Sequence, residues 1–124
     1  MYFFQATGLL DQIVGTALLL FCVRAITDEK NLALPAHLIP FAVGSVVLNL
    51  GICFGYNCGY AINPARDFGP RLFSFLAGYG SEVFSAYDYW MFMPILGPHL
   101  GAVIGSLGYD LMVGFHWPLE EASK

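Results

Sequence analysis

Charged residues are scarce in this sequence of 124 residues, and positively charged ones are the scarcest. Lys, Arg, Asp and Glu make up 11% of the residues, whereas they make up about a quarter of an ordinary soluble domain. Five Lys and Arg residues are outnumbered by nine Asp and Glu residues, for a net charge of −4. This balance disfavours a soluble domain and excludes the basic face that binds nucleic acid.

Cysteine is also scarce, and its spacing fits neither a disulfide framework nor a metal site. The three cysteines are Cys22, Cys53 and Cys58, with four residues between the last two and no histidine pair nearby. Zinc and redox sites use other spacings. We therefore predict no metal site and interpret these cysteines as packing residues.

The sequence lacks the paired groups that catalysis requires. A nucleophile or general base would have to be Asp11, Asp67 or His99, and none has a partner within reach along the chain. We therefore predict that the protein is not an enzyme and holds no cofactor.

Apolar residues are abundant, at 57% of the sequence. A helix that crosses a bilayer needs roughly 20 mostly apolar residues. Three stretches approach that length, at about 6–26, 38–54 and 90–115, and a polar connector at 81–89 precedes the last. We predict an all-α membrane protein in which residues 1–124 form a single membrane domain with three transmembrane helices.

Residues 55–80 fit neither a full span nor a water-soluble loop. The middle of this segment, about 64–76, is apolar but only half a span long, and both flanks are rich in glycine. Such a segment is tolerated at membrane depth only where its ends are buried in protein or line a wet cavity. We therefore predict a re-entrant half-helix.

The densest polar cluster lies at the start of this predicted half-helix. Asn63 is a preferred N-cap, Pro64 a preferred first helical residue, and Asp67 falls in the first turn, where negative charge is favoured. Helix capping alone explains these residues. Capping does not explain why a helix would start near the bilayer midplane with Arg66 beside it. At that place the charge of Arg66 and the positive end of the helix would repel cations, while the side-chain amide of Asn63 could donate a hydrogen bond to passing water. The cluster therefore indicates a conduit for neutral, hydrogen-bonding solutes.

The residues before the half-helix extend this prediction. Asn57, Cys58, Gly59 and Tyr60 are interpreted as irregular backbone whose carbonyl groups form a ladder of hydrogen-bond acceptors. Donors on one wall and acceptors on the other suit a hydroxylated solute.

The segment 55–80, which contains GYAINPARDFGPRLF, resembles the second re-entrant loop of the aquaporin superfamily, and the resemblance extends over about 4–114. The presence of Asp67 directly after Arg66 resembles the motif of the glycerol-conducting branch of this superfamily, the aquaglyceroporins. The resemblance implies an aquaporin-like half repeat with three transmembrane helices and one re-entrant half-helix.

The resemblance also implies a role for individual residues. The second NPA motif corresponds to Asn63, Pro64 and Ala65, and the selectivity filter, the narrowest part of the pore, to Gly51, Tyr60 and Arg66. Water-selective members are expected to carry a histidine where this chain has Gly51. Glycine widens the filter, and Tyr60 offers an aromatic wall for the carbon skeleton of a polyol.

Two further residues are expected to support the filter. In the resemblance, Asp67 orients the loop near Arg66, and Gln12 matches a position that often holds a buried Glu or Gln in contact with the loop backbone. Both would hold the pore lining in place rather than bind solute.

The chain differs from the family in length. Members have two inverted halves, each with three spans and one half-helix, and this sequence contains one NPA motif and no internal repeat. One interpretation is the C-terminal half of a passive channel for glycerol, water and other small neutral solutes that excludes ions and protons. The other is a truncated, non-conducting fragment that pairs or interferes with full-length channel subunits.

The expected surroundings follow from the same resemblance and from the basic residues. The resemblance implies contact with membrane lipid, an N-terminal half of the same fold, and a homotetramer of full-length subunits. Arg24 and Lys30 flank the first connector and Lys124 ends the chain. Because basic residues favour the cytoplasmic side, we predict a multi-pass protein of the plasma membrane with a cytoplasmic C-terminus.

Overall fold

The computed structural model describes residues 2–118, with side chains from residue 6, and this part of the chain contains helices and no strand. Lys124 lies outside the described residues. The elements in chain order are α1 (Tyr2–Thr27), α2 (Ile39–Cys58), α3 (Pro64–Ser74), the π-helical turn η1 (Phe75–Tyr79), α4 (Glu82–Tyr89), α5 (Phe92–Met112) and the 3₁₀ turn η2 (Gly114–His116).

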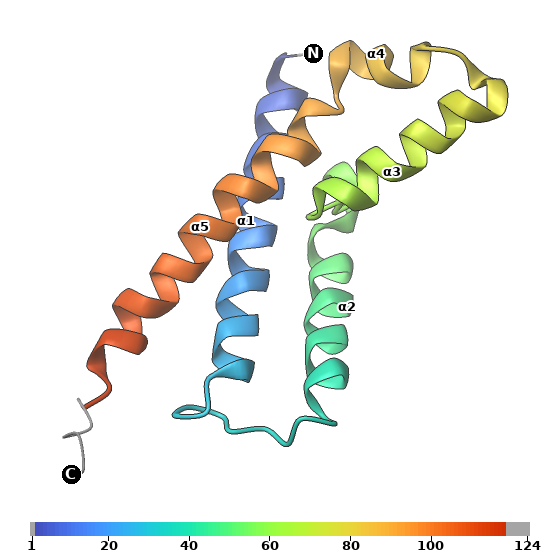
Figure 1. The fold of residues 1–124 in the computed structure, drawn as a ribbon. Coiled ribbons are helices and arrows are strands. Elements are labelled where there is room, and N and C mark those ends of the chain that lie inside the picture. The colour runs from blue at the N-terminus through green and yellow to red at the C-terminus, as the bar shows by residue number, and fades with distance from the viewer. Residues whose placement is uncertain (1, 119–124) are drawn as a thin grey trace, which may run out of the picture.

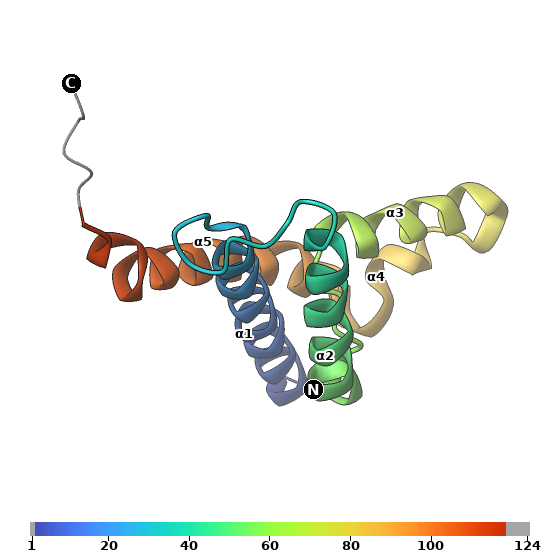
Figure 2. The same ribbon diagram turned by 90° about the horizontal axis from the view of Figure 1, so that it is seen from below.

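Helix α1 is the centre of the arrangement, because it contacts both other long helices (Figures 1 and 2). Helix α2 runs back along α1 in the opposite direction, and α5 crosses α1 obliquely. The shorter α3 starts beside the upper part of α2, contacts α5, and runs outward to the end of the bundle where α4 and the N-terminus lie. The chain thus enters the bundle and leaves it again on the same side.

Two helical segments are long and apolar enough to cross a membrane. These are Ala6–Thr27, with 22 residues, and Ile39–Cys58, with 20. The segment Phe92–His116 is long and apolar enough to cross a membrane only if it is counted together with α4, from which it is bent by 70°. Helix α2 therefore continues four residues beyond the predicted range of 38–54.

The connector predicted at 81–89 is partly helical, which the sequence analysis did not anticipate. Helix α4 begins regularly at Glu82, but the backbone leaves the helical conformation at Ala86, Tyr87 and Asp88. The last two have φ of 53° and 55°, in the left-handed region. This break turns the chain into α5.

Glycines allow the backbones of α1 and α5 to touch. A Cβ atom added at Gly105 would lie 2.8 Å from the carbonyl carbon of Ala17, and one at Gly101 would lie 2.9 Å from Cβ of Thr16. Any side chain at these positions would therefore push the helices apart. Close backbone approach of this kind is the usual role of small residues spaced four apart in membrane helices.

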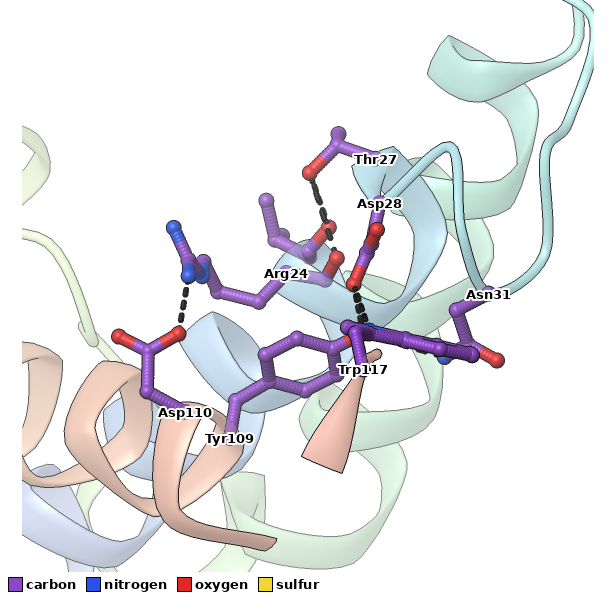
Figure 3. Close-up of polar contacts among 8 residues, drawn as sticks. Arg24, Thr27, Asp28, Asn31, Tyr109, Asp110 and Trp117 are labelled. Carbon is purple, nitrogen blue, oxygen red and sulfur yellow. Dashed lines mark hydrogen bonds and ion pairs between the residues drawn. The ribbon is translucent and has the colours of Figure 1, made fainter. Parts of the chain in front are cut away.

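A polar cluster joins α1, the following connector and the end of α5 at the other end of the bundle (Figure 3). The Tyr109 hydroxyl donates to Asp28 Oδ2 at 2.7 Å and accepts from Asn31 Nδ2 at 3.3 Å. Trp117 Nε1 donates to the same Asp28 oxygen at 3.1 Å, and Arg24 forms an ion pair with Asp110. Asp28 is thus the common acceptor of this cluster.

We expect Gly105→Ala to destabilise the protein in detergent micelles by about 1–3 kcal/mol, the usual range for overpacking. The added methyl group would overlap the backbone of Ala17, so α1 and α5 would have to separate. Gly44→Ala in α2 is the matched control, because a Cβ there meets no atom within 4 Å. Denaturant unfolding followed by circular dichroism measures both, and equal stability of Gly105→Ala and the wild type would contradict the close approach.

We expect the stability contributed by Tyr109 to depend on pH. The hydrogen bond from the Tyr109 hydroxyl, and next the one from the backbone N–H of Lys30, lower the pKa of Asp28 below its ordinary value. A carboxyl with a lowered pKa stabilises the folded state above its ordinary pKa of about 4, and this contribution disappears as the pH falls through the lowered value. Tyr109→Phe should therefore be less stable than the wild type at pH 7, with a smaller difference at pH 3.

Unfolding curves of both proteins at the two pH values give this difference. Tyr79→Phe is the control, because the Tyr79 side chain is 77% exposed and lies outside the cluster. A Tyr109→Phe difference that is the same at both pH values would show that the bond to Asp28 does not contribute.

Candidate functional site

The start of α3 is capped by the side chain of Asn63. Its backbone is extended, with φ −158° and ψ 114°, and its Oδ1 accepts from the N–H groups of Ala65 at 3.0 Å and Arg66 at 3.3 Å. Pro64 is the first helical residue, where its missing N–H costs nothing. The Asn63 side chain is exposed, and its Nδ2 donates to no residue within the described part of the chain.

The connection from α2 to α3 is tightly turned. Helix α2 ends at Cys58 and is capped by Gly59, whose φ of 78° favours glycine. Tyr60 and Ile62 both have φ of 40°. Non-glycine residues in this region are strained and persist where the surroundings hold them. Of these two, only Tyr60 lies in the segment predicted to be irregular backbone. Asn57 and Cys58 are helical, because α2 continues to Cys58, so that part of the prediction is wrong.

The residue that holds this connection is Gln12 of α1. Its side chain is fully buried, its Oε1 accepts from the N–H of Ile62 at 2.7 Å, and its Nε2 donates to Cys58 Sγ at 3.1 Å. Ile62 is itself buried. Without Gln12 its N–H would be a buried donor with no partner, which costs about 1–3 kcal/mol. Gln12 thus contacts the backbone of the connection, while its support of a filter stays a prediction.

The three predicted filter residues lie together. Arg66 Nη1 donates to the backbone carbonyl of Tyr60 at 3.1 Å, and its guanidinium carbon stands 4.5 Å from the centre of the Tyr60 ring. A Cβ atom at Gly51 would lie 2.8 Å from Cζ of that ring, and one at Gly55 would lie 3.2 Å from its Cδ1. The absent side chain of Gly51 thus makes room for the ring of Tyr60, a contact that the sequence analysis did not foresee.

Two other predicted site residues have polar partners, one within α3 and one on α1. Asp67 pairs with Arg71, one turn further along α3, through Nε at 2.5 Å and Nη2 at 3.1 Å. The side-chain amide of Asn57 donates to Asp11 of α1. Asp11, Gly55 and Arg71 were not assigned to the site from sequence, although the spacing of Asp67 and Arg71 by four residues is a signal for an ion pair within a helix.

Within the described residues, no group of three or more His, Cys, Asp or Glu side chains is placed to hold a metal ion. The charged groups near α3 are instead engaged with one another or with backbone. The start of α3 thus brings together backbone carbonyls, the amide of Asn63, the ring of Tyr60 and the guanidinium of Arg66.

The described part of the chain is thus a bundle of long apolar helices with the short helix α3 beside them. The family described as "Major intrinsic protein" matches residues 2–109, so the chain belongs to this family and is an integral, multi-pass membrane protein. The proteins of this family are channels and not enzymes, which confirms the prediction on catalysis. The predicted resemblance to aquaporins is also confirmed.

Individual relatives agree with this assignment. Aquaporin-10 of Milnesium tardigradum is 43% identical to this chain over an alignment of 129 residues, which covers 94% of this chain and 32% of that protein. Aquaporin-10 of Homo sapiens is 48% identical over 111 residues, which cover 90% of this chain and 37% of that protein. The chain thus spans about a third of the length of these relatives.

The fold agrees as well. The X-ray structure of the aquaglyceroporin from Plasmodium falciparum matches with a TM-score of 0.84 at 29% identity, covering 90% of this chain and 46% of that one. An all-α, aquaporin-like fold is therefore confirmed. The number of membrane-spanning helices stays a prediction.

We expect Gln12→Leu to loosen the connection between α2 and α3, because the N–H of Ile62 would lose its acceptor. Gln12→Glu is the matched control, since it keeps an oxygen in the same place. Hydrogen exchange of residues 59–63 should be faster in Gln12→Leu than in the wild type and less affected in Gln12→Glu. Unchanged exchange in Gln12→Leu would show that other contacts hold this segment.

Proposed function

We propose that this chain forms one half of a passive membrane channel that conducts glycerol, water and other small neutral solutes and excludes ions and protons. The observation that carries the proposal is the contact of Arg66 with Tyr60 over Gly51 and Gly55. It combines a charged hydrogen-bond donor with an apolar ring in one constriction. A polyol, whose face carries both hydroxyl groups and carbon, is matched by such a wall.

Exclusion of cations follows from the charges at the same place. The N-terminus of α3 carries the positive end of the helix dipole, and Arg66 adds a full charge. Asn63 offers a neutral donor beside them. A neutral solute can exchange its hydrogen bonds for these donors, whereas a cation loses its hydration and meets only positive charge.

The backbone upstream of α3 supplies the acceptors in this proposal. Asn57, Cys58 and Gly59 form the end of α2 and its cap, and the chain then turns through Tyr60 into the strained connection. Their carbonyl groups would accept hydrogen bonds from the solute. Asp67 and Gln12 would hold the surrounding backbone in place, through Arg71 and Ile62 respectively.

The pore would be completed by a second half of the same fold. A hollow of about 390 Å³ beside the NPA motif is lined by Pro64, Ala65, Phe68 and Ile95 and is open to the outside. A helix N-terminus of this kind would be costly against lipid. We infer that an N-terminal half covers this hollow and that full-length subunits form a homotetramer in the plasma membrane, with the C-terminus of this chain in the cytoplasm.

Solute uptake into proteoliposomes tests the proposal. We expect glycerol and water flux when this chain is reconstituted with the N-terminal half of human Aquaporin-10, and none from this chain alone. Flux from the lone chain would overturn the half-pore proposal. Absence of flux from the combined halves, once their association has been shown by crosslinking, would favour a non-conducting fragment that interferes with channel subunits.

We expect Gly51→His to reduce glycerol flux more than water flux in the combined halves. The imidazole would displace the ring of Tyr60, because even a Cβ at this position would lie 2.8 Å from it, and would narrow the constriction to about the size of water. Tyr60→Phe is the control, since it keeps the ring that stacks on Arg66. Equal loss of both fluxes in Gly51→His would argue against a sizing role for this position.

A further inference from the structure

The charged pair of Asp67 and Arg71 lies immediately next to the proposed filter. Two nitrogens of Arg71 bind both oxygens of the Asp67 carboxylate, and the side chains are only 20% and 16% exposed. A bidentate pair of this kind is among the stronger side-chain interactions. Because Asp67 follows Arg66 directly, the pair fixes a negative charge one residue from the filter cation.

The pair spans a turn of α3 in which a backbone bond is missing. Pro70 lies inside the helix and has no N–H, so the bond that residue 70 would donate to the carbonyl of Arg66 cannot form. The contact between Asp67 and Arg71 bridges this turn with side chains instead.

Arg71 also joins α3 to α4. Its third hydrogen bond runs from Nη1 to the carbonyl of Val83 at 2.8 Å. Arg71 also lines a hollow of about 300 Å³ together with Asn57, Cys58 and Gly59. Arg71 is thus held from two helices, close to the backbone proposed to line the pore.

Arg66 makes no ion pair with any residue in the part of the chain that the structure describes. Its contacts are the carbonyl and the ring of Tyr60. Asp67, the neighbouring carboxylate, is occupied by Arg71. The charge of the proposed filter is therefore left uncompensated because a second arginine takes up the adjacent negative charge.

We propose that Arg71 is a specificity-determining residue, which keeps the filter positively charged by binding the carboxylate of Asp67. This inference rests on the proposed function of Arg66 in the constriction. Arg66, Asp67 and Arg71 together carry a charge of +1. Removing the charge of Arg71 alone would bring the group to neutrality and leave the carboxylate of Asp67 without its partner beside Arg66, so cations would meet a weaker barrier.

Four variants separate this role from a structural one. Arg71→Met makes the group neutral, Arg71→Lys keeps its charge, and Asp67→Asn raises its charge to +2. The double variant Asp67→Asn/Arg71→Met restores +1 without restoring the ion pair or the bond to Val83. A purely structural role would leave the double variant as defective as Arg71→Met.

The first measurement is the ratio of potassium leak to glycerol flux in proteoliposomes that contain both halves. We expect Arg71→Met to raise this ratio about two- to tenfold, the range for one unit charge at close distance near water. Arg71→Lys should stay near the wild type, and the double variant should leak less than Arg71→Met. An unchanged ratio in Arg71→Met, or a double variant as leaky as Arg71→Met, would overturn the inference.

The second measurement does not require conduction. With Cys22→Ser and Cys53→Ser, Cys58 is the remaining thiol, and it lines the same hollow as Arg71. The reaction rate of Cys58 with an anionic thiosulfonate, divided by its rate with a cationic one, should fall in Arg71→Met, rise in Asp67→Asn and return toward wild type in the double variant. A ratio of the two rates that is the same in all variants would overturn the inference. Missing glycerol flux in the wild type would instead count against the proposed function.

Discussion

The structure depends on the requirement that backbone N–H groups inside a bundle of apolar helices find acceptors within the protein. Between α2 and α3 the chain leaves the helical conformation, and the N–H of Ile62 points into the buried interior. Gln12 supplies the acceptor from α1, and Asn63 supplies it for the first turn of α3. Because these N–H groups have acceptors, the short helix α3 can begin inside the bundle. The proposed constriction depends on this position of the start of α3.

The position of Gln12 depends in turn on the contact between α1 and α5. A Cβ at Gly97 would lie 2.5 Å from Cβ of Gln12, and Gly101 and Gly105 bring the same two helices together further along. The helices can approach this closely only because α5 presents glycine. The close contact of α1 with the glycines of α5 therefore positions Gln12, which in turn holds the strained connection between α2 and α3. The polar cluster around Asp28 fixes the far end of the same two helices.

Much of the fold could be predicted from local sequence rules, and much of the site could not. Asn63 and Pro64 define a helix start by capping chemistry alone, and α3 begins there. Apolar length predicted α1 and α2, although α2 continues to Cys58 because nothing ends it before Gly59 takes a left-handed conformation. The regular turn at the start of α4 has no strong periodic signal, so the sequence predicts only a connector there.

The contacts missed from the sequence are those between distant segments. The ring of Tyr60 lies over Gly51 and Gly55, and the amide of Asn57 reaches Asp11 on another helix. No spacing rule gives such pairs, since they depend on how the chain turns at residues 59–63. The ion pair of Asp67 with Arg71 is different, because its spacing of four residues was visible in the sequence and only its importance was overlooked.

The contact of Tyr60 with α2 means that positions 51 and 60 share one volume. A larger residue at one of them can be accommodated only if the other becomes smaller or moves. Substitutions at these positions are therefore not additive. In the proposed pore, the size of the opening would be a property of this pair, so solute preference could be altered by exchanging volume between a helix and a loop without any change in Arg66.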